Sequence, residues 1–388
     1  MPKPISMALL ATVSGLSSFS LAIVLPALPS LAEDFQSSPG RTQFLVSAYL
    51  LGLALSQPLW GHITDRVGRR PVILIGFALY TLASVTCLLS SSLTSLMLLR
   101  VIQAVGASTG TVVARAVIRD SFAAAEGAKA MSWVTIGLGA APVVAPIIGG
   151  VVLLSGSSDG LFICMAALGA TLGLLVFLKL PETLGTDAPR PAWGSLFSSY
   201  ARLLGNRGFV GYTAIYGLVQ GGFFAFLAVG AAVFADSFAL SPTAFGLIWG
   251  FMGVAYVLGA LIGGRLASGS RRPALLPICM ITTLTLGLSV AAFDFLLGAQ
   301  PATVLLPLFL MMIAAGCTTP MVMAGAVYQL PDVAGTAAGL SSAMGMTLGG
   351  AFTIAAGSVY RGDFTPIAHL IALSAILTFA SWLIVRRA

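Results

Sequence analysis

About twelve long apolar runs, separated by short polar loops, constrain this 388-residue chain more than any other feature. Its mean hydropathy is +1.01. Only 8% of its residues are charged, against roughly 25% in a soluble domain. Because a membrane-spanning helix needs roughly 20 apolar residues, we expect spans at 5–31, 42–63, 72–91, 95–117, 128–154, 160–180, 208–234, 243–266, 273–293, 303–326, 334–358 and 366–385. The runs are continuously apolar rather than alternating, which predicts helices and not a barrel.

The basic residues orient these spans. The run 5–31 is too long for a signal peptide, and we expect it to remain as the first span. With a cytoplasmic N-terminus, only Arg41 and Arg361 fall outside, while the other loop bases fall on the cytoplasmic side. This asymmetry follows the positive-inside rule and predicts a bacterial-type cytoplasmic (inner) membrane protein with both termini in the cytoplasm. The net charge of +7 is spread over many loops, so no nucleic-acid-binding stripe is expected.

Two segments of the chain also resemble each other. Residues 61–71 read GHITDRVGRRP, and residues 263–273 read GGRLASGSRRP, with Ala267 where the first copy has Asp65. An internal repeat of six-helix units with a site between them is a recurring design of secondary transporters. We therefore predict an N-terminal six-helix bundle over 1–184 and a C-terminal one over 208–388. A cytoplasmic linker with a short amphipathic segment is expected between them, at 185–207.

Arg100 is the one charged side chain placed deep within a predicted span. An arginine at the centre of a spanning helix costs about 2.5–3.5 kcal/mol, which favours a polar site on a substrate or ion pathway. The alternative is that Arg100 bonds backbone carbonyls and fixes helix packing. The four cysteines show no metal-ligand spacing and are expected to be buried thiols. We predict no cofactor and no metal.

The segment Gly61-x-x-x-Asp65-Arg66-x-Gly68-Arg69-Arg70 is the most specific motif. Asp65 can accept hydrogen bonds from the N-terminus of a neighbouring helix, and the arginines can anchor the loop at an anionic membrane surface. The motif resembles the loop signature of the major facilitator superfamily, and the resemblance extends over the whole chain. It implies an all-α fold of 12 transmembrane helices in two pseudo-symmetric six-helix bundles. It also implies a gate at this loop, with Arg119 nearby.

Further stretches resemble the Bcr/CflA drug-resistance subfamily of proton-coupled exporters. They include Leu25–Pro29, Arg100–Ala107, Ala114–Asp120 and Ala334–Leu340. A run of small residues and prolines in the fifth span resembles the antiporter signature of the superfamily's exporters, with Ala145 where that signature usually has glycine. It contains Gly137, Pro142, Pro146, Gly149 and Gly150.

The resemblance implies residues that couple substrate to protons. Arg100 matches an arginine implicated in proton coupling, and Gln103 shares its helix face. The first span departs from the family pattern, because Ala22 stands where an acid is usual. The remaining candidates for a protonatable group are His369, in the outer part of the last span, and four acids near the outer face, Glu33, Asp34, Asp236 and Asp294. The alternative is that His369 is a packing residue and that the acids are solvated loop charges or helix caps.

The resemblance implies a cavity lined by the first, fourth, seventh and tenth spans, and the alternative for side chains at helical spacing there is ordinary packing. Serines, aromatic rings and threonines are the side chains expected there, since aromatic surfaces adapt to varied ligands. The candidates are Ser14, Ser17, Ser18, Tyr212, Tyr216, Gln220, Phe223, Phe224, Thr318 and Thr319.

Together these features predict proton-coupled efflux of small organic compounds or drugs by alternating access. The expected partners are a small-molecule substrate, protons and membrane lipids, and we expect a monomer. The alternative is a dedicated carrier of an anionic or zwitterionic natural product, such as a siderophore or an amino-acid derivative. An enzyme is not expected, because no metal pattern, phosphate loop or soluble catalytic domain is present. A pore fits the loop motif and the repeat less well.

Overall fold

The computed structural model describes the chain outside residues 1–5, 38, 43, 155–156, 186–191, 237–241, 267–271, 362 and 388. Part of the predicted linker and part of the second copy of the repeat therefore lie outside the described residues. Within the described part, eleven helices are long and apolar enough to cross a membrane, and a shorter apolar stretch covers Gly250–Leu266. The expected twelve-helix fold is confirmed. Spans of this kind are helical because lipid offers backbone N–H and C=O groups no hydrogen-bond partners, and a helix pairs these groups internally.

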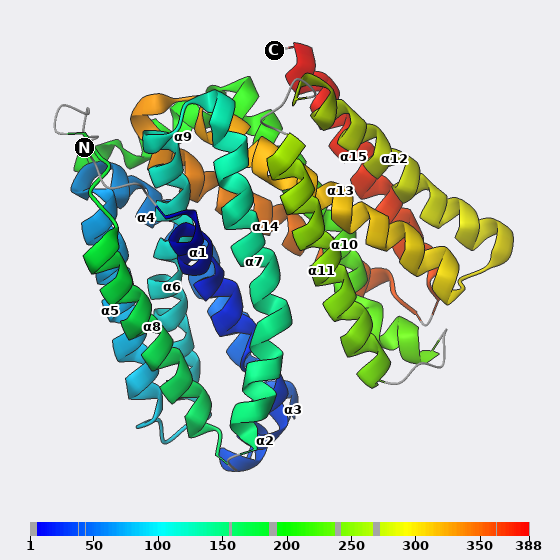
Figure 1. Cartoon of the computed structure of the whole chain (residues 1–388). Helices are drawn as coiled ribbons and strands as arrows, with labels where there is room; N and C mark the ends of the chain where they lie inside the picture. Colours follow the sequence, from blue (N-terminus) through cyan, green and yellow to red (C-terminus); the bar gives the residue numbers. More distant parts are fainter. Residues whose placement is uncertain are drawn as a thin grey trace. The chain divides into compact units, whose positions relative to one another are not determined.

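The chain is helical from end to end of its described part (Figure 1). The long helices are α1 (Met7–Ala22), α4 (Phe44–Val67), α5 (Arg69–Cys87), α6 (Leu93–Ser121), α7 (Ala124–Leu153), α8 (Asp159–Lys179), α10 (Arg207–Asp236), α11 (Pro242–Leu266), α12 (Arg272–Leu297), α13 (Pro301–Val327), α14 (Ala334–Val359) and α15 (Thr365–Arg387). The short ones are η1 (Leu25–Ala27), α2 (Leu28–Asp34), α3 (Pro39–Thr42), η2 (Trp193–Ser195), α9 (Leu196–Gly205) and η3 (Pro331–Val333).

Two predicted boundaries are corrected. The run 5–31 is not one helix: α1 ends at Ala22, and η1 and α2 follow, each with a proline in its first positions. Proline lacks a backbone N–H, and its ring clashes with the carbonyl four residues earlier, so it kinks or breaks a helix. The segment 61–71 is not an extended loop either. Gly68 alone separates α4 from α5, at a φ of 115° that glycine adopts without strain.

The chain divides into two compact units. Unit 1 contains Met1–Phe122, Ile136–Tyr200 and Leu330–Ala343, and unit 2 contains Ala123–Thr135, Ala201–Gln329 and Met344–Ala388. The units largely follow the two predicted bundles, with the start of α7 in unit 2 and the start of α14 in unit 1. The predicted bundle boundaries at 184 and 208 stay a prediction.

In unit 1, α6 packs against α1, α4 and α5, and α8 packs against α5 (Figure 1). Small residues bring these backbones together, as is usual in lipid. A Cβ on Gly52 of α4 would lie 2.7 Å from the Val101 oxygen, and one on Gly106 would lie 2.5 Å from the Gly76 oxygen of α5. Large side chains at these positions would separate α6 from its neighbours.

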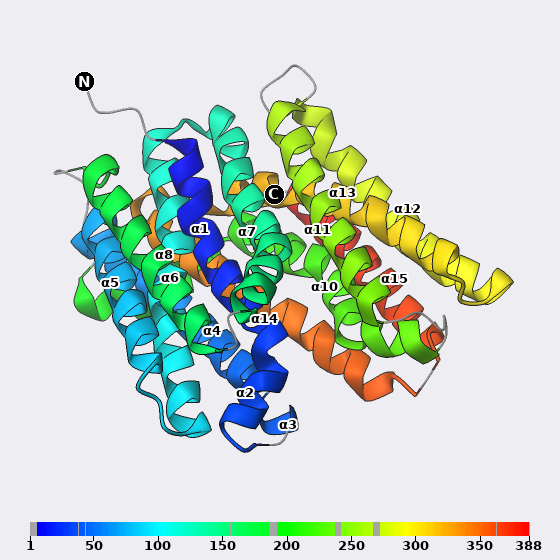
Figure 2. The same cartoon turned by 60° about the horizontal axis from the view of Figure 1, so that its bottom comes forward.

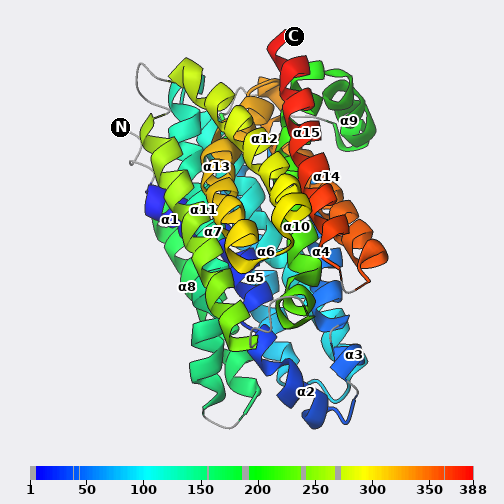
Figure 3. The ribbon, with the colours of Figure 1, turned by 90° about the vertical axis from the view of Figure 1, so that its right-hand side faces the viewer.

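In unit 2, α13 packs against α10, α11 and α12, while α15 packs against α10 and α12 (Figures 2 and 3). Glycines again mark the closest approaches, since Gly259 and Gly263 of α11 lie against the backbone of α13. The helix α13 therefore has the same central position in unit 2 that α6 has in unit 1.

Candidate functional site

Asp65, in the last turn of α4, binds the first turn of α14. Its carboxylate is 2% exposed. It accepts three hydrogen bonds of 2.7 Å, from the backbone N–H groups of Gly335 and Thr336 and from the Thr336 hydroxyl. The first N–H groups of a helix have no acceptor within the helix, and the helix dipole favours an anion there. The interaction of Asp65 with a helix N-terminus is therefore present, as the motif predicted.

Arg69, the first residue of α5, joins Asp65 to α6. Its Nη1 donates to Asp65 Oδ1 at 2.9 Å, and its Nε and Nη2 donate to the Asp120 carboxylate at 2.8 and 3.3 Å. Arg69 itself is 2% exposed. Forked, charge-assisted bonds of this kind fix both distance and direction. We call Asp65, Arg69 and Asp120 the Asp65 cluster.

Glu182, which follows α8, caps the N-terminus of α5. Its two carboxylate oxygens accept the backbone N–H groups of Arg69 at 2.9 Å and Arg70 at 3.1 Å. It also lies 2.6 Å from where a Cβ on Gly68 would be. Sequence reasoning missed the structural parts of Asp120 and Glu182. Asp120 ends one of the stretches that resemble the Bcr/CflA subfamily, whereas no pattern in the sequence pointed to Glu182.

The other predicted gate bases lie around the cluster. Arg70 donates to the Phe177 backbone oxygen at 2.6 Å, and its guanidinium lies 5.2 Å from the centre of the Phe177 ring. Arg66 is half-buried in the last turn of α4, and Arg119 is half-buried near the end of α6. Their part in a gate stays a prediction.

Arg100 lies inside unit 1, only 1% exposed. It donates to the Ser20 backbone oxygen and to Gln103 Oε1, both at 2.9 Å, and its guanidinium lies 4.2 Å from the centre of the Tyr49 ring. Gln103 in turn donates to Ser84 at 2.8 Å. Carbonyl dipoles and an aromatic face both stabilise a buried cation. Within the described residues, no carboxylate forms an ion pair with Arg100.

The contacts of Arg100 fit the packing alternative, and its role on a substrate or ion pathway stays a prediction. Its bonds to Ser20 and Gln103 fix helix packing, as the structural alternative predicted. Its positive charge is nonetheless balanced only by neutral groups, so a proton acceptor or an anion would be attracted to it. Tyr49, which sequence reasoning missed, comes from α4 and supplies the aromatic face. The helix α6 also buries Arg115, 1% exposed, against the Ser342 hydroxyl, so Arg100 is not the one deeply buried arginine.

The two histidines of the chain have opposite environments. His369, the predicted coupling candidate, is exposed in the second turn of α15. His62, which sequence reasoning passed over inside the motif, is 4% exposed in α4. Neither ring nitrogen of His62 has a hydrogen-bond partner among the described residues. A buried imidazole without a hydrogen-bond partner is unusual. In the sequence, the feature that pointed to His62 was its position three residues before Asp65.

The predicted serines of α1 are engaged within unit 1. The hydroxyl of Ser14 donates to the Leu10 oxygen at 2.6 Å, and Ser17 lies 3.4 Å from the Thr111 hydroxyl. Both serines are buried, while Ser18 is half-buried. A cavity-lining role for the three stays a prediction.

The predicted residues of α10 and α13 belong to unit 2. Rings from α10 fill the space above glycines of its neighbours: Tyr212 at Gly325, Tyr216 at Gly345 and Phe224 at Gly349, while Phe223 lies edge-on to Phe224 at 6.0 Å. Gln220 is half-buried and its Oε1 has no partner among the described residues. In α13, Thr318 donates to a backbone oxygen of its own helix, and Thr319 lies 3.1 Å from the Tyr256 hydroxyl. Their lining role also stays a prediction.

The small residues of α7 do allow close packing. A Cβ on Gly137 would collide with the Ala11 oxygen of α1, and one on Gly149 with the oxygen of Ile23, the residue that follows α1. A Cβ on Gly150 would meet nothing within 4 Å. Pro142 and Pro146 lie within the helix. Gly137 and Gly149 therefore set the approach of α1 to α7, and an antiporter role for the motif stays a prediction.

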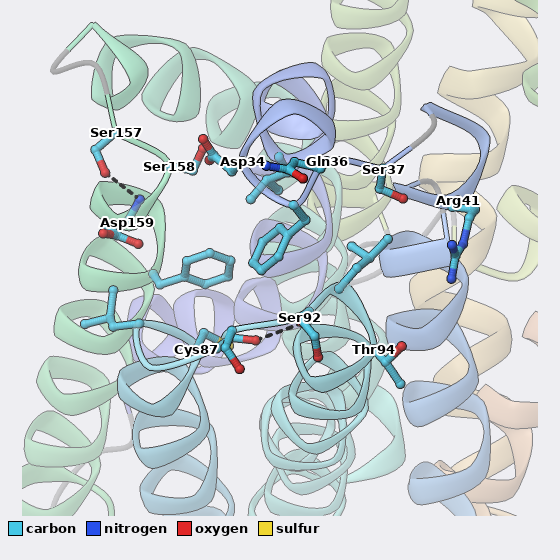
Figure 4. A pocket seen from close by; sticks show the side chains of 17 residues that line it. Asp34, Gln36, Ser37, Arg41, Cys87, Ser92, Thr94, Ser157, Ser158 and Asp159 are labelled. Atoms are coloured by element: carbon cyan, nitrogen blue, oxygen red, sulfur yellow. Dashed lines mark hydrogen bonds between the residues drawn. The ribbon is translucent and has the colours of Figure 1, made fainter.

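A pocket of about 790 Å³ lies at the end of unit 1 that carries α2 and α3 (Figure 4). Its lining is rich in hydroxyl groups, with Asp34, Gln36 and Asp159 among the polar side chains and Phe162 among the apolar ones. None of the predicted site residues lines it. Within the described residues, no group of histidine, cysteine or acidic side chains could hold a metal ion.

The comparisons with known proteins agree with the architecture. The family model described as Major Facilitator Superfamily matches residues 10–354. Multidrug resistance protein D of Escherichia coli is 33% identical over 82% of this chain and 79% of its own length. The bicyclomycin resistance protein homolog of Haemophilus influenzae is 25% identical over 88% and 85%. Among solved structures, the human organic anion transporter MFSD10 superposes with a TM-score of 0.78, at 19% identity over 98% of both chains.

Proposed function

This chain belongs to the Major Facilitator Superfamily and is a multi-pass membrane transporter with Bcr/CflA-like relatives, and we propose that it exports small organic compounds in exchange for protons. The names of two relatives, a multidrug resistance protein and a bicyclomycin resistance homolog, support drugs or drug-like compounds as the substrate class. The proline- and glycine-rich α7 supports exchange over uptake.

The observation that carries the proposal is the bond between Asp65 and the first turn of α14. Alternating access needs an element that is held in one state and released in another. Three hydrogen bonds to a buried carboxylate hold this turn, and Arg69 and Asp120 fix the carboxylate. We propose that the Asp65 cluster, with Arg66, Arg70 and Arg119 near it, keeps the cytoplasmic side closed.

Arg100 and Gln103 form the proposed coupling site. The guanidinium has no carboxylate partner within the described residues, so a substrate or a proton-carrying group could change its electrostatic balance. We place the protein in the cytoplasmic membrane with both termini in the cytoplasm, which the distribution of basic residues supports. We propose that it acts as a monomer surrounded by lipid, and its many exposed large apolar side chains support the contact with lipid.

Proton movement in proteoliposomes tests this function. Purified protein is reconstituted with a pH-sensitive dye inside, and a lipophilic cation (tetraphenylphosphonium), bicyclomycin and an organic anion (p-aminohippurate) are added in turn. We expect a dye signal from a subset of the compounds that disappears in Arg100→Ala. Exchange of a labelled compound with no dye signal would contradict proton coupling.

The second candidate is a carrier of an anionic or zwitterionic natural product. The uncompensated charge of Arg100 favours it, because a guanidinium binds a carboxylate through two parallel bonds. In the same assay this candidate predicts signals from the anion alone, and Arg100→Ala would abolish transport of an acidic compound but not of a neutral one.

A further inference from the structure

The proposed exchange leaves one group unassigned, the side chain that carries the proton. The first span has no acid at the usual position, and Ala22 is buried. Within the described spans, Asp65 is already saturated by Arg69 and the first turn of α14. His369 is exposed at the end of α15. The other buried acid among the described residues, Asp294, lies in the last turn of α12. His62 is the one buried histidine among them, and histidine is the side chain that ordinarily gains or loses a proton nearest neutral pH.

His62 is buried next to the point where α4 meets α14. The residue before it, Gly61, lies so close to Gly335 that a Cβ there would collide with its backbone oxygen. The residue three positions after it is Asp65, and side chains three apart on a helix are neighbours. The imidazole is therefore on the same side of α4 as the carboxylate that holds α14, although neither ring nitrogen has a hydrogen-bond partner among the described residues.

We propose that His62 is the proton-binding group of this transporter, and that its protonation releases the first turn of α14. The proposal rests on the proposed exchange function. A ring nitrogen of His62 takes a proton from water, and the imidazolium gives Asp65 a cationic partner on its own helix. The same positive charge opposes the positive end of the α14 dipole. Both effects weaken the bonds from Asp65 to Gly335 and Thr336, and the proton is later returned to water on the other side.

Protonation of His62 would add a positive charge to a region that already has more basic than acidic side chains. The charged groups on the elements packed against this end of α4 are Asp65 and Arg66 on α4, Arg69 and Arg70 on α5, Arg115, Arg119 and Asp120 on α6, and Asp332 on η3. The first turn of α14 carries none. Arg69 donates hydrogen bonds to both Asp65 and Asp120. If Asp65 binds the His62 imidazolium in place of Arg69, Arg69 therefore stays paired with Asp120.

Buried hydroxyls extend from the Arg100 region toward His62. Ser108 lies about two turns after Arg100 on α6 and Ser56 about two turns before His62 on α4, and their hydroxyls are 2.8 Å apart. Both side chains are buried. Hydroxyl groups both donate and accept hydrogen bonds, so this pair supplies polar contacts for a proton moving between the two sites.

Direct observation of the ring tests the assignment. Because the chain has two histidines, His369→Gln leaves His62 as the only one, provided the purification tag contains none. The variant is labelled with ¹⁵N-histidine in nanodiscs and followed by NMR over roughly pH 5 to 8, where histidine titrates. We expect the ring to change from neutral to charged in this range, and Asp65→Asn to shift that change. A ring that stays neutral throughout would overturn the proposal.

A transport experiment separates this proposal from the proposed function. The compound that the wild-type protein exchanges is tested on His62→Gln and on the matched control His369→Gln. We expect His62→Gln to exchange the labelled compound while its proton movement falls about tenfold or more, and the control to behave as wild type. Proton movement in His62→Gln within about twofold of wild type would overturn the His62 assignment alone. No proton movement in the wild type would refute the exchange function itself. If His62→Gln loses both activities, the NMR titration decides.

Discussion

Replacing Asp65 by asparagine should release the first turn of α14. The amides of Gly335 and Thr336 have Asp65 as their hydrogen-bond acceptor, so their hydrogen exchange reports directly on this bond. Removing one partner of a buried ion pair costs about 3–5 kcal/mol, and about 1.4 kcal/mol is a factor of ten. Asp65→Asn should therefore accelerate exchange at these two amides by roughly 10² to 10⁴.

The assay is hydrogen exchange read by mass spectrometry with fragmentation to single residues. Thr336→Val is the graded control, because it removes only the hydroxyl bond. A single hydrogen bond is worth about 0.5–1.5 kcal/mol, or up to about 3 when one partner is charged, so this variant should accelerate exchange less than Asp65→Asn. Amides in the middle of α14 should be unchanged. Exchange in Asp65→Asn within about threefold of wild type would refute the reasoning that the carboxylate holds this turn.

Three further outcomes follow from the packing and the charges. Gly137→Ala should lower the melting temperature and the transport rate, because the added Cβ collides with α1. Gly150→Ala should lower neither, because its Cβ meets nothing within 4 Å. Equal effects of the two substitutions would contradict this reasoning. Gly68→Ala should destabilise by about 1–3 kcal/mol, since it forces a Cβ into φ 115° against Glu182, as thermal unfolding would measure. Burial raises the pKa of the Tyr200 phenol from 10.0 to about 12, so folding opposes ionisation of this phenol. The contribution of Tyr200 to stability is therefore complete below pH 10 and is lost as the pH rises toward 12. An absorbance titration in which Tyr200→Phe removes no late-ionising phenol would refute this last outcome.

The number and type of the spanning helices could be predicted because lipid imposes a length and a composition on each of them. The break after Ala22 could have been anticipated from Pro26 and Pro29, since a proline kinks or breaks a helix. The extension of α4 to Val67 could not be anticipated, because Asp65 and Arg66 resemble a loop in composition. The helix end that Asp65 binds lies 270 residues away in the sequence.

The candidate site was predictable only in part. The pairing of Asp65 with a helix N-terminus followed from the motif, but its identity as the start of α14 depended on contacts 270 residues away. The environment of Arg100 required Tyr49 and Ser20, whose residue types carry no sequence signal for a cation site. His62 and His369 could not be told apart by residue type, since burial decides which of them is shielded from water.

The central claim, exchange of an organic compound for protons, is tested most directly by uphill transport. Proteoliposomes are prepared with an acidic interior and a neutral exterior, and the labelled compound is present at equal concentration on both sides. The account predicts that the compound accumulates inside as protons leave, and that a protonophore abolishes the accumulation. A compound that stays at equal concentration on both sides despite the pH gradient, while still exchanging across the membrane, would contradict the account.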